Sequence, residues 1–88
     1  MDKHDRKFME LLFKLCLARY EEESAADVQF TYPHYRHRLR IMDKVVKYEK
    51  LLNKMREKFE VPNNIEEIVE VGKTFIEGAM NAKVNPVE

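Results

Sequence analysis

The chain has 88 residues, enough for one domain, and its 44% hydrophobic and 36% charged residues are typical of a globular protein rather than a disordered one. A domain this small buries only about 60% of its unfolded surface, so its core is marginal without a partner. The net charge is zero, which disfavours a basic nucleic-acid-binding domain, and the single cysteine excludes an intramolecular disulfide.

The zero net charge conceals three unequal parts. Residues 1–31 hold five basic and seven acidic residues, residues 32–59 hold nine and three, and residues 60–88 hold two and six. A middle part of +6 therefore lies between flanks of −2 and −4. No signal peptide and no apolar run of about 18 residues is visible, so we expect a soluble cytoplasmic protein without a membrane partner.

The first predicted helix runs from about residue 3 to residue 23. Its apolar arc is wider than one neighbouring helix can cover, so the helix is expected to lie at the centre of the fold or to form an oligomer interface. Cys16 lies within this arc and is expected to be a small buried residue rather than a nucleophile. The arc consists of Phe8, Met9, Leu11, Leu12, Phe13, Leu15, Cys16, Leu17 and Tyr20.

A connector is predicted from Ser24 to Tyr32. The run from Ser24 to Asp27 ends the helical pattern, and Val28, Phe30 and Tyr32 then alternate with polar residues. Such alternation is typical of a short extended segment. The chain offers it no second strand, so we expect an irregular segment or one that pairs with its own copy across a two-fold axis.

The second helix is predicted from about Pro33 to Phe59, before the stop at Val61 and Pro62. Its apolar residues recur at spacings of 4, 3, 4, 3 and 4, as in a coiled-coil seam. They are Ile41, Val45, Tyr48, Leu52, Met55 and Phe59. A helix of this length spans about 40 Å, too long for a compact monomer of this size, so we expect a protruding end, a kink or a dimer.

Seven basic residues form a row on the same predicted helix. Spacings of three or four place them on one face over about 33 Å. The row is Arg36, Arg40, Lys44, Lys47, Lys50, Lys54 and Lys58. One interpretation is a solvated face whose charge is neutralised by acidic residues of the molecule or its dimer. The other is a binding surface for an acidic protein or for the phosphates of a nucleic acid. The position of the third helix, which is acidic on its polar face, decides between internal and external neutralisation.

The third helix is predicted to begin at Ile65, because Asn64 followed by Glu66 and Glu67 is a start signal. Gly72 and Ala79 lie on its apolar face and allow a close helix crossing. The rest of that face is Ile65, Ile68, Val69, Phe75, Ile76 and Met80, opposite Glu66, Glu67, Glu70 and Glu77. The domain is predicted to span residues 1–81, and residues 82–88 are predicted to be a tail.

Aromatic and basic residues alternate from Tyr32 to Arg40, a pattern found in single-strand binders and in protein-interaction hot spots. His34 and His37 share a helical face, but a closed zinc site needs about four ligands. No group of residues has the arrangement of an active site, and no Gly-rich loop is present to hold a phosphate. We therefore expect no catalysis, no metal and no cofactor.

The sequence thus predicts an all-α domain of three helices, with a long central helix and a helical homodimer. Its expected function is that of a small non-catalytic protein-interaction module, such as an adaptor, regulator or inhibitor, which binds an acidic surface of another protein. The alternative is a nucleic-acid-binding regulator that uses the basic row. The expected partner-binding residues are Tyr32, Tyr35, Arg36, His37, Arg40, Lys44 and Lys47.

Overall fold

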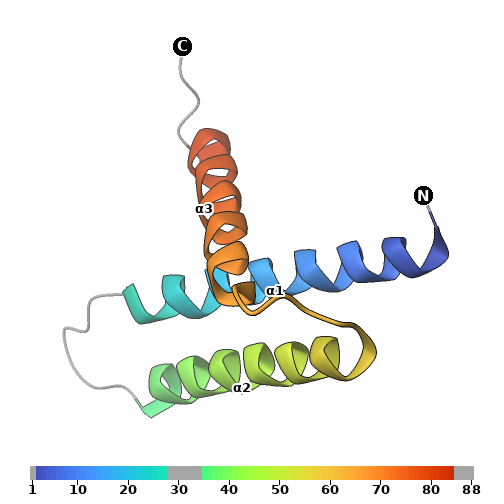
Figure 1. The fold of residues 1–88 in the computed structure, drawn as a ribbon. Coiled ribbons are helices and arrows are strands. Elements are labelled where there is room, and N and C mark those ends of the chain that lie inside the picture. The colour runs from blue at the N-terminus through green and yellow to red at the C-terminus, as the bar shows by residue number, and fades with distance from the viewer. Residues whose placement is uncertain (1, 28–34, 85–88) are drawn as a thin grey trace.

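A computed structural model describes residues 2–27 and 35–84 of the chain. For six of these residues the description stops at the backbone: Ala26, Asp27, Tyr35, His37, Lys83 and Val84. The described residues form three α-helices, α1 (Lys3–Asp27), α2 (Tyr35–Lys58) and α3 (Ile65–Val84), and no strand (Figure 1). The predicted all-α class with three helices is confirmed. The predicted extended segment falls at residues 28–32, outside the described residues.

Two helices end later than the sequence predicted. α1 continues to Asp27 through the residues assigned to the connector, because Ala25 and Ala26 have the highest helix propensity and outweigh the flanking Ser24 and Asp27. α3 continues to Val84, so residues 82–84 are helical. Residue 86 is a proline, and a residue before a proline is biased away from the helical conformation. α3 ends at Val84, two residues before this proline.

Hydrogen bonds show why α1 and α3 begin where they do. The carboxylate of Asp2 accepts a bond of 3.2 Å from the backbone N–H of His4, which is an N-cap contact. Before α3, the carbonyl of Pro62 accepts the N–H of Ile65 at 3.1 Å. The carbonyl of Asn64 then accepts the N–H of Ile68 at 3.1 Å, so α3 begins after Asn64 as predicted.

α1 and α2 lie side by side as an antiparallel pair, and α3 leaves this pair at a steep angle (Figure 1). α1 packs against both other helices, which agrees with its wide apolar arc, whereas α2 and α3 do not run along each other. The predicted central helix, α2, is therefore central in chain order only. Phe8 near the start of α1 meets Phe59 just after α2 edge to face, with ring centroids 5.3 Å apart.

The core lies where α3 crosses the helix pair. Leu15 of α1 and Met55 of α2 have no exposed surface, and Cys16 is buried as predicted. Cys16 also faces Gly72, and a Cβ at position 72 would overlap its Sγ atom, so glycine permits the predicted close crossing. The buried apolar residues are Leu11, Leu15, Cys16, Ala18, Tyr48, Leu52, Met55, Ile65 and Val69.

The steep crossing produces an open molecule. Its radius of gyration is 15.0 Å, whereas a compact domain of this length has about 12 Å. The chain exposes 7168 Å², against about 5,500 Å² for a compact protein of the same mass. α3 packs on α1 through its first half, and residues 77–82 are all exposed.

Candidate partner-binding surfaces

The basic row lies on α2 beside the seam that packs on α1, roughly 110° around the helix from it. Glu21 of α1 reaches the row at two points. Lys44 donates a hydrogen bond of 2.7 Å to one carboxylate oxygen of Glu21, and Lys47 donates one of 3.3 Å to the other. The bond from Lys44 and the nearby charge of Lys47 lower the pKa of Glu21. Part of the row is therefore neutralised within the molecule, by α1.

The other five residues of the row are exposed and make no ion pair with any residue in the described part of the chain. They are Arg36, Arg40, Lys50, Lys54 and Lys58.

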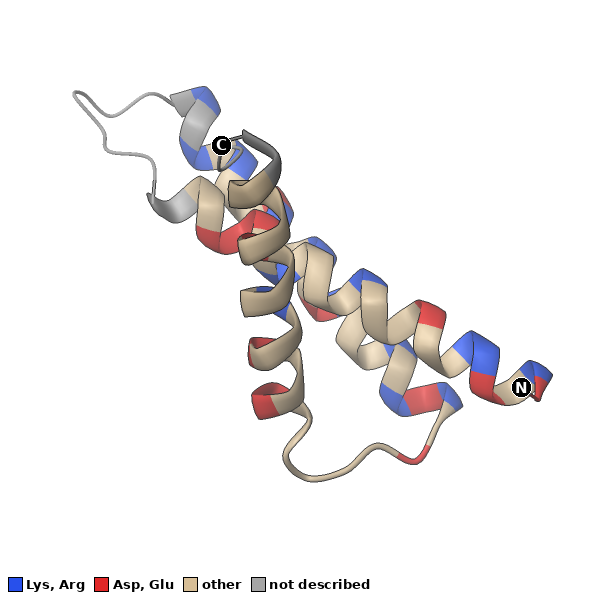
Figure 2. Ribbon diagram, turned by 90° about the horizontal axis from the view of Figure 1, so that it is seen from above, with Lys and Arg blue, Asp and Glu red and all other residues tan. Residues whose placement is uncertain are grey.

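The acidic face of α3 does not lie against these residues. Glu66 accepts a hydrogen bond of 2.6 Å from the hydroxyl of Tyr48. Glu70 accepts one of 3.5 Å from Arg19 and lies 3.0 Å from the amine of Lys73. Basic residues are spread along α1 and α2, whereas acidic residues mark the first half of α3 (Figure 2). Within the described ranges, α3 thus directs its carboxylates to α1, to Tyr48 or to solvent.

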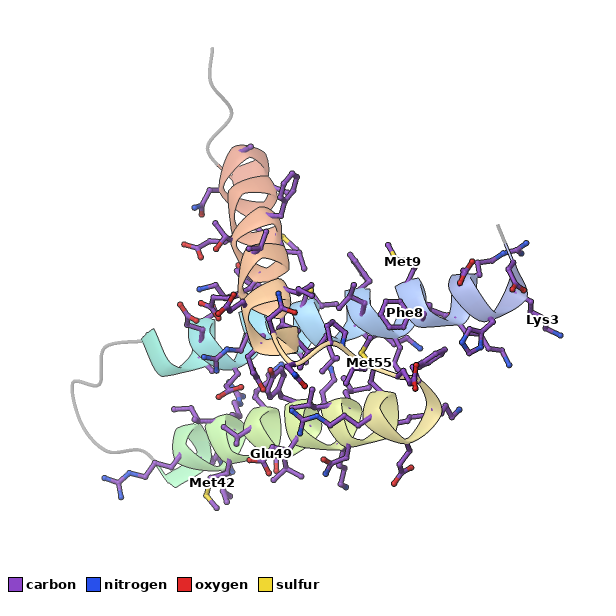
Figure 3. All side chains as sticks on the ribbon, in the orientation of Figure 1. Lys3, Phe8, Met9, Met42, Glu49 and Met55 are labelled. Atoms are coloured by element: carbon purple, nitrogen blue, oxygen red, sulfur yellow. The ribbon has the colours of Figure 1, made fainter. Side chains whose placement is uncertain are left out.

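Apolar side chains are exposed next to the unpaired part of the row. Met42 is 61% exposed and points away from α1, as does Glu49 (Figure 3). Leu39 and Val46 lie one turn before and after Met42 on the same face and are also exposed. Val46 and Leu51 line a shallow depression whose other lining residues are Asp43, Lys47, Lys50 and Lys54. The outer side of α2 therefore combines apolar and basic groups.

The positive surface continues from α2 onto α1 at the end near Phe59. Lys7 and Lys14 of α1 and Lys54 and Lys58 of α2 surround one groove, which Leu11 and Phe59 also line. Glu10 lies in the same groove and forms an exposed ion pair of 3.5 Å with Lys14. Three of the four lysines thus have no carboxylate partner among the described residues. The sequence did not predict this contribution from α1.

Apolar side chains are also exposed on α1 and on α3. Phe75 is 80% exposed, Val71 66% and Phe13 59%. Met9 lies on the side of α1 opposite to α2, and Phe13 follows it by one turn (Figure 3). The sequence placed Phe75 on the apolar face of the third helix, but it did not show that this part of the face remains uncovered.

Lys73 forms a buried contact that the sequence analysis missed. Its side chain is 8% exposed, and its amine lies 2.7 Å from a carboxylate oxygen of Glu23, 3.0 Å from Glu70 and 4.0 Å from Glu77. The hydrogen bonds that the amine donates to Glu23 and Glu70 raise the pKa of Lys73 and favour its protonated form. A protonated amine has no lone pair for nucleophilic attack. This cluster therefore acts as a bridge between α1 and α3.

The structure describes only some of the other residues that the sequence analysis considered for binding or metal coordination. Tyr32 and His34 lie outside the described residues, and the side chains of Tyr35 and His37 are not described either. Within the described ranges no three His, Cys, Asp or Glu side chains converge to hold a metal ion. Burial raises the pKa of the Cys16 thiol and favours its protonated form.

None of the described helices combines the length and the apolar character that a membrane span requires. No protein-family model matches the chain, and neither a curated protein nor a solved structure resembles it significantly.

Proposed function

We propose that the chain is a small non-catalytic, cytoplasmic protein-interaction module that binds an acidic surface of another protein along the outer side of α2. The observation that supports this function is the mixture of exposed groups there: Leu39 lies one turn after Arg36 and Val46 one turn before Lys50, and Met42 lies between them on the same apolar face. An acidic protein segment provides carboxylates for the cations and apolar side chains for Met42 and Val46. A phosphate backbone provides an anion only.

The residues of the row have different roles in this proposal. Arg36 and Arg40 are exposed and unpaired among the described residues, and a guanidinium binds a carboxylate through two parallel hydrogen bonds. Lys44 and Lys47 are already bonded to Glu21, so they bind the partner only in competition with that carboxylate. Tyr32, Tyr35 and His37 remain predicted contacts near the start of α2.

We also propose that the module is a homodimer. The support is the open shape: the radius of gyration exceeds that of a compact domain by roughly a quarter. A chain that exposes this much surface for its length gains stability when part of the surface is buried in a partner.

One observation favours a nucleic-acid-binding regulator as the second candidate. Lys7 and Lys14 extend the positive surface of α2 onto α1, which gives an anionic polymer two rows of contacts. Its affinity for DNA or RNA would fall steeply with salt concentration, because bound phosphates release counterions.

The proposed function is tested by affinity capture from an extract of the native host, with and without nuclease. The row variant Arg36→Glu with Arg40→Glu is compared with Lys3→Glu and Arg6→Glu, a matched charge change on exposed residues near the start of α1. Wild type and control retain a partner protein after nuclease treatment, and the row variant retains at least about tenfold less. Loss on nuclease treatment favours the nucleic-acid candidate, and equal retention by the row variant contradicts the assigned surface.

A further inference from the structure

In the part of the chain that the structure describes, the second half of α3 extends past α1 and packs along no other helix, although Glu77 and Asn81 still line a pocket with Tyr20 and Ser24 of α1. Val69, Lys73 and Ile76 face α1, and Met80 continues the same side of α3 one turn later. Met80 is nevertheless 40% exposed, and every residue from 77 to 82 is exposed. An isolated helix shorter than about 12–15 residues is marginal in water, and helices in proteins are stabilised mostly by packing of their apolar face. Among the described residues, the second half of α3 has little of this packing.

An uncharged seam runs along this part of α3. Val71, Phe75, Gly78 and Ala82 follow one another at spacings of 4, 3 and 4, the repeat of two packed helices. All four are exposed, and space for a side chain is open at Gly78. Ile68, Thr74 and Ala79 lie beside the seam and are uncharged, and Glu67 lies one turn before Val71, where the seam ends. Two large residues provide apolar area, while the two small ones permit a close approach of another helix.

We propose that a second copy of this chain covers the seam, with α3 packed against α3 across a two-fold axis. In such a contact each residue lies near its own copy, so a charged residue in the seam would repel itself. The seam has no charged residue, which makes it self-compatible. This inference rests on the homodimer proposed above, and it identifies the surface that the two copies share.

The molecule as a whole exposes more surface than a compact protein of its mass, and Val71 and Phe75 of the seam belong to this exposed surface. The chain exposes roughly 1,700 Å² more than a compact protein of 10.6 kDa, whereas one partner in a standard interface buries about 800 Å². The extending half of α3 projects on the side of α1 away from α2 (Figure 1). The dimer therefore leaves the outer side of α2 open for the acidic partner.

The experiment is sedimentation equilibrium of the full chain at tens of micromolar, for wild type and three variants. Phe75→Glu and Val71→Glu each introduce a charge into the seam at an exposed position, so the contacts with α1 are kept. Met42→Glu is the matched control, because it makes the same kind of change at an exposed residue of α2. Circular dichroism of each variant checks that the helices form.

Wild type and Met42→Glu sediment at twice the 10.6 kDa of one chain. The two seam variants raise the dimer dissociation constant by about 30-fold or more, as loss of an interface hot spot does. A wild type that sediments as a monomer overturns both the homodimer and the seam. A seam variant that still dimerises like wild type overturns the seam alone. A monomeric Met42→Glu variant moves the interface to α2 and also overturns the seam.

Discussion

Gly72 lies where α3 crosses α1, and the crossing leaves no room there for a side chain. Gly72→Ala gains about 1 kcal/mol of helix propensity, but the new Cβ overlaps the Sγ atom of Cys16. Overpacking of a core costs about 1–3 kcal/mol. We expect a net loss of about 1 kcal/mol in the free energy of unfolding, measured by urea denaturation at a fixed chain concentration.

The cause of this loss can be separated from a general effect on α3. In a Cys16→Ala background the Sγ atom is absent, so Gly72→Ala is expected to cost less than it does beside Cys16. A Gly72→Ala chain that is more stable than wild type would contradict the close crossing.

Individual core residues were largely predictable, and Lys73 was not. Leu15 and Met55 follow the helical apolar period, so their burial follows from sequence spacing. Lys73 lies between Val69 and Ile76 on the same helical face, and this position is the sequence signal for its burial. Its partner Glu23 lies 50 residues earlier in the chain, a distance over which no sequence pattern connects the two.

At the scale of the elements, Glu21 joins α1 to α2 and makes their contact sensitive to acid. Its pKa is lowered in the folded chain, so the carboxylate stabilises the fold above its ordinary pKa of 4.5 and loses this effect as the pH falls through the lowered value. Glu21→Gln is expected to lower the free energy of unfolding at pH 7 by at most about 1 kcal/mol, because the ion pairs are partly exposed. The difference from wild type shrinks in acid.

Urea denaturation at pH 7 and at steps below pH 5 measures this difference. Glu49→Gln is the control, since Glu49 is exposed on α2 and has no ion pair among the described residues. The control is expected to follow wild type at every pH. A Glu21→Gln variant that does the same would show that the contacts of Glu21 with Lys44 and Lys47 contribute nothing to stability.

The existence of the helices was more predictable than their ends and angles. Apolar period and capping residues identified all three described helices. The predicted end of α1 at residue 23 is wrong, because the helix propensity of Ala25 and Ala26 outweighs the tendency of Ser24 and Asp27 to end a helix. α3 approaches α1 closely at Gly72 and Cys16, and a sequence pattern shows that a close crossing is allowed but not where its partner lies.

For the whole molecule, the sequence shows how charge is divided along the chain, but it does not show which charged residues pair with one another in the fold. Among the described residues, the carboxylates of α3 form no ion pair with the basic row, because α3 leaves the helix pair and directs Glu70 to Arg19 and Lys73. Glu21 of α1 neutralises the row at Lys44 and Lys47 instead. The unpaired remainder of the row and the apolar residues beside it are the basis of the proposed partner surface.

The central claim is that the outer side of α2 binds another protein, and site-specific photo-crosslinking tests it most directly. A photoreactive benzoylphenylalanine replaces Met42 in one chain and Lys3 in a control chain, both exposed positions (Figure 3). In native host extract, position 42 is predicted to give a protein adduct that survives nuclease and differs in mass from two copies of the chain, while position 3 gives none. An adduct at position 42 that nuclease removes, or one that consists of two copies of this chain, would contradict the account.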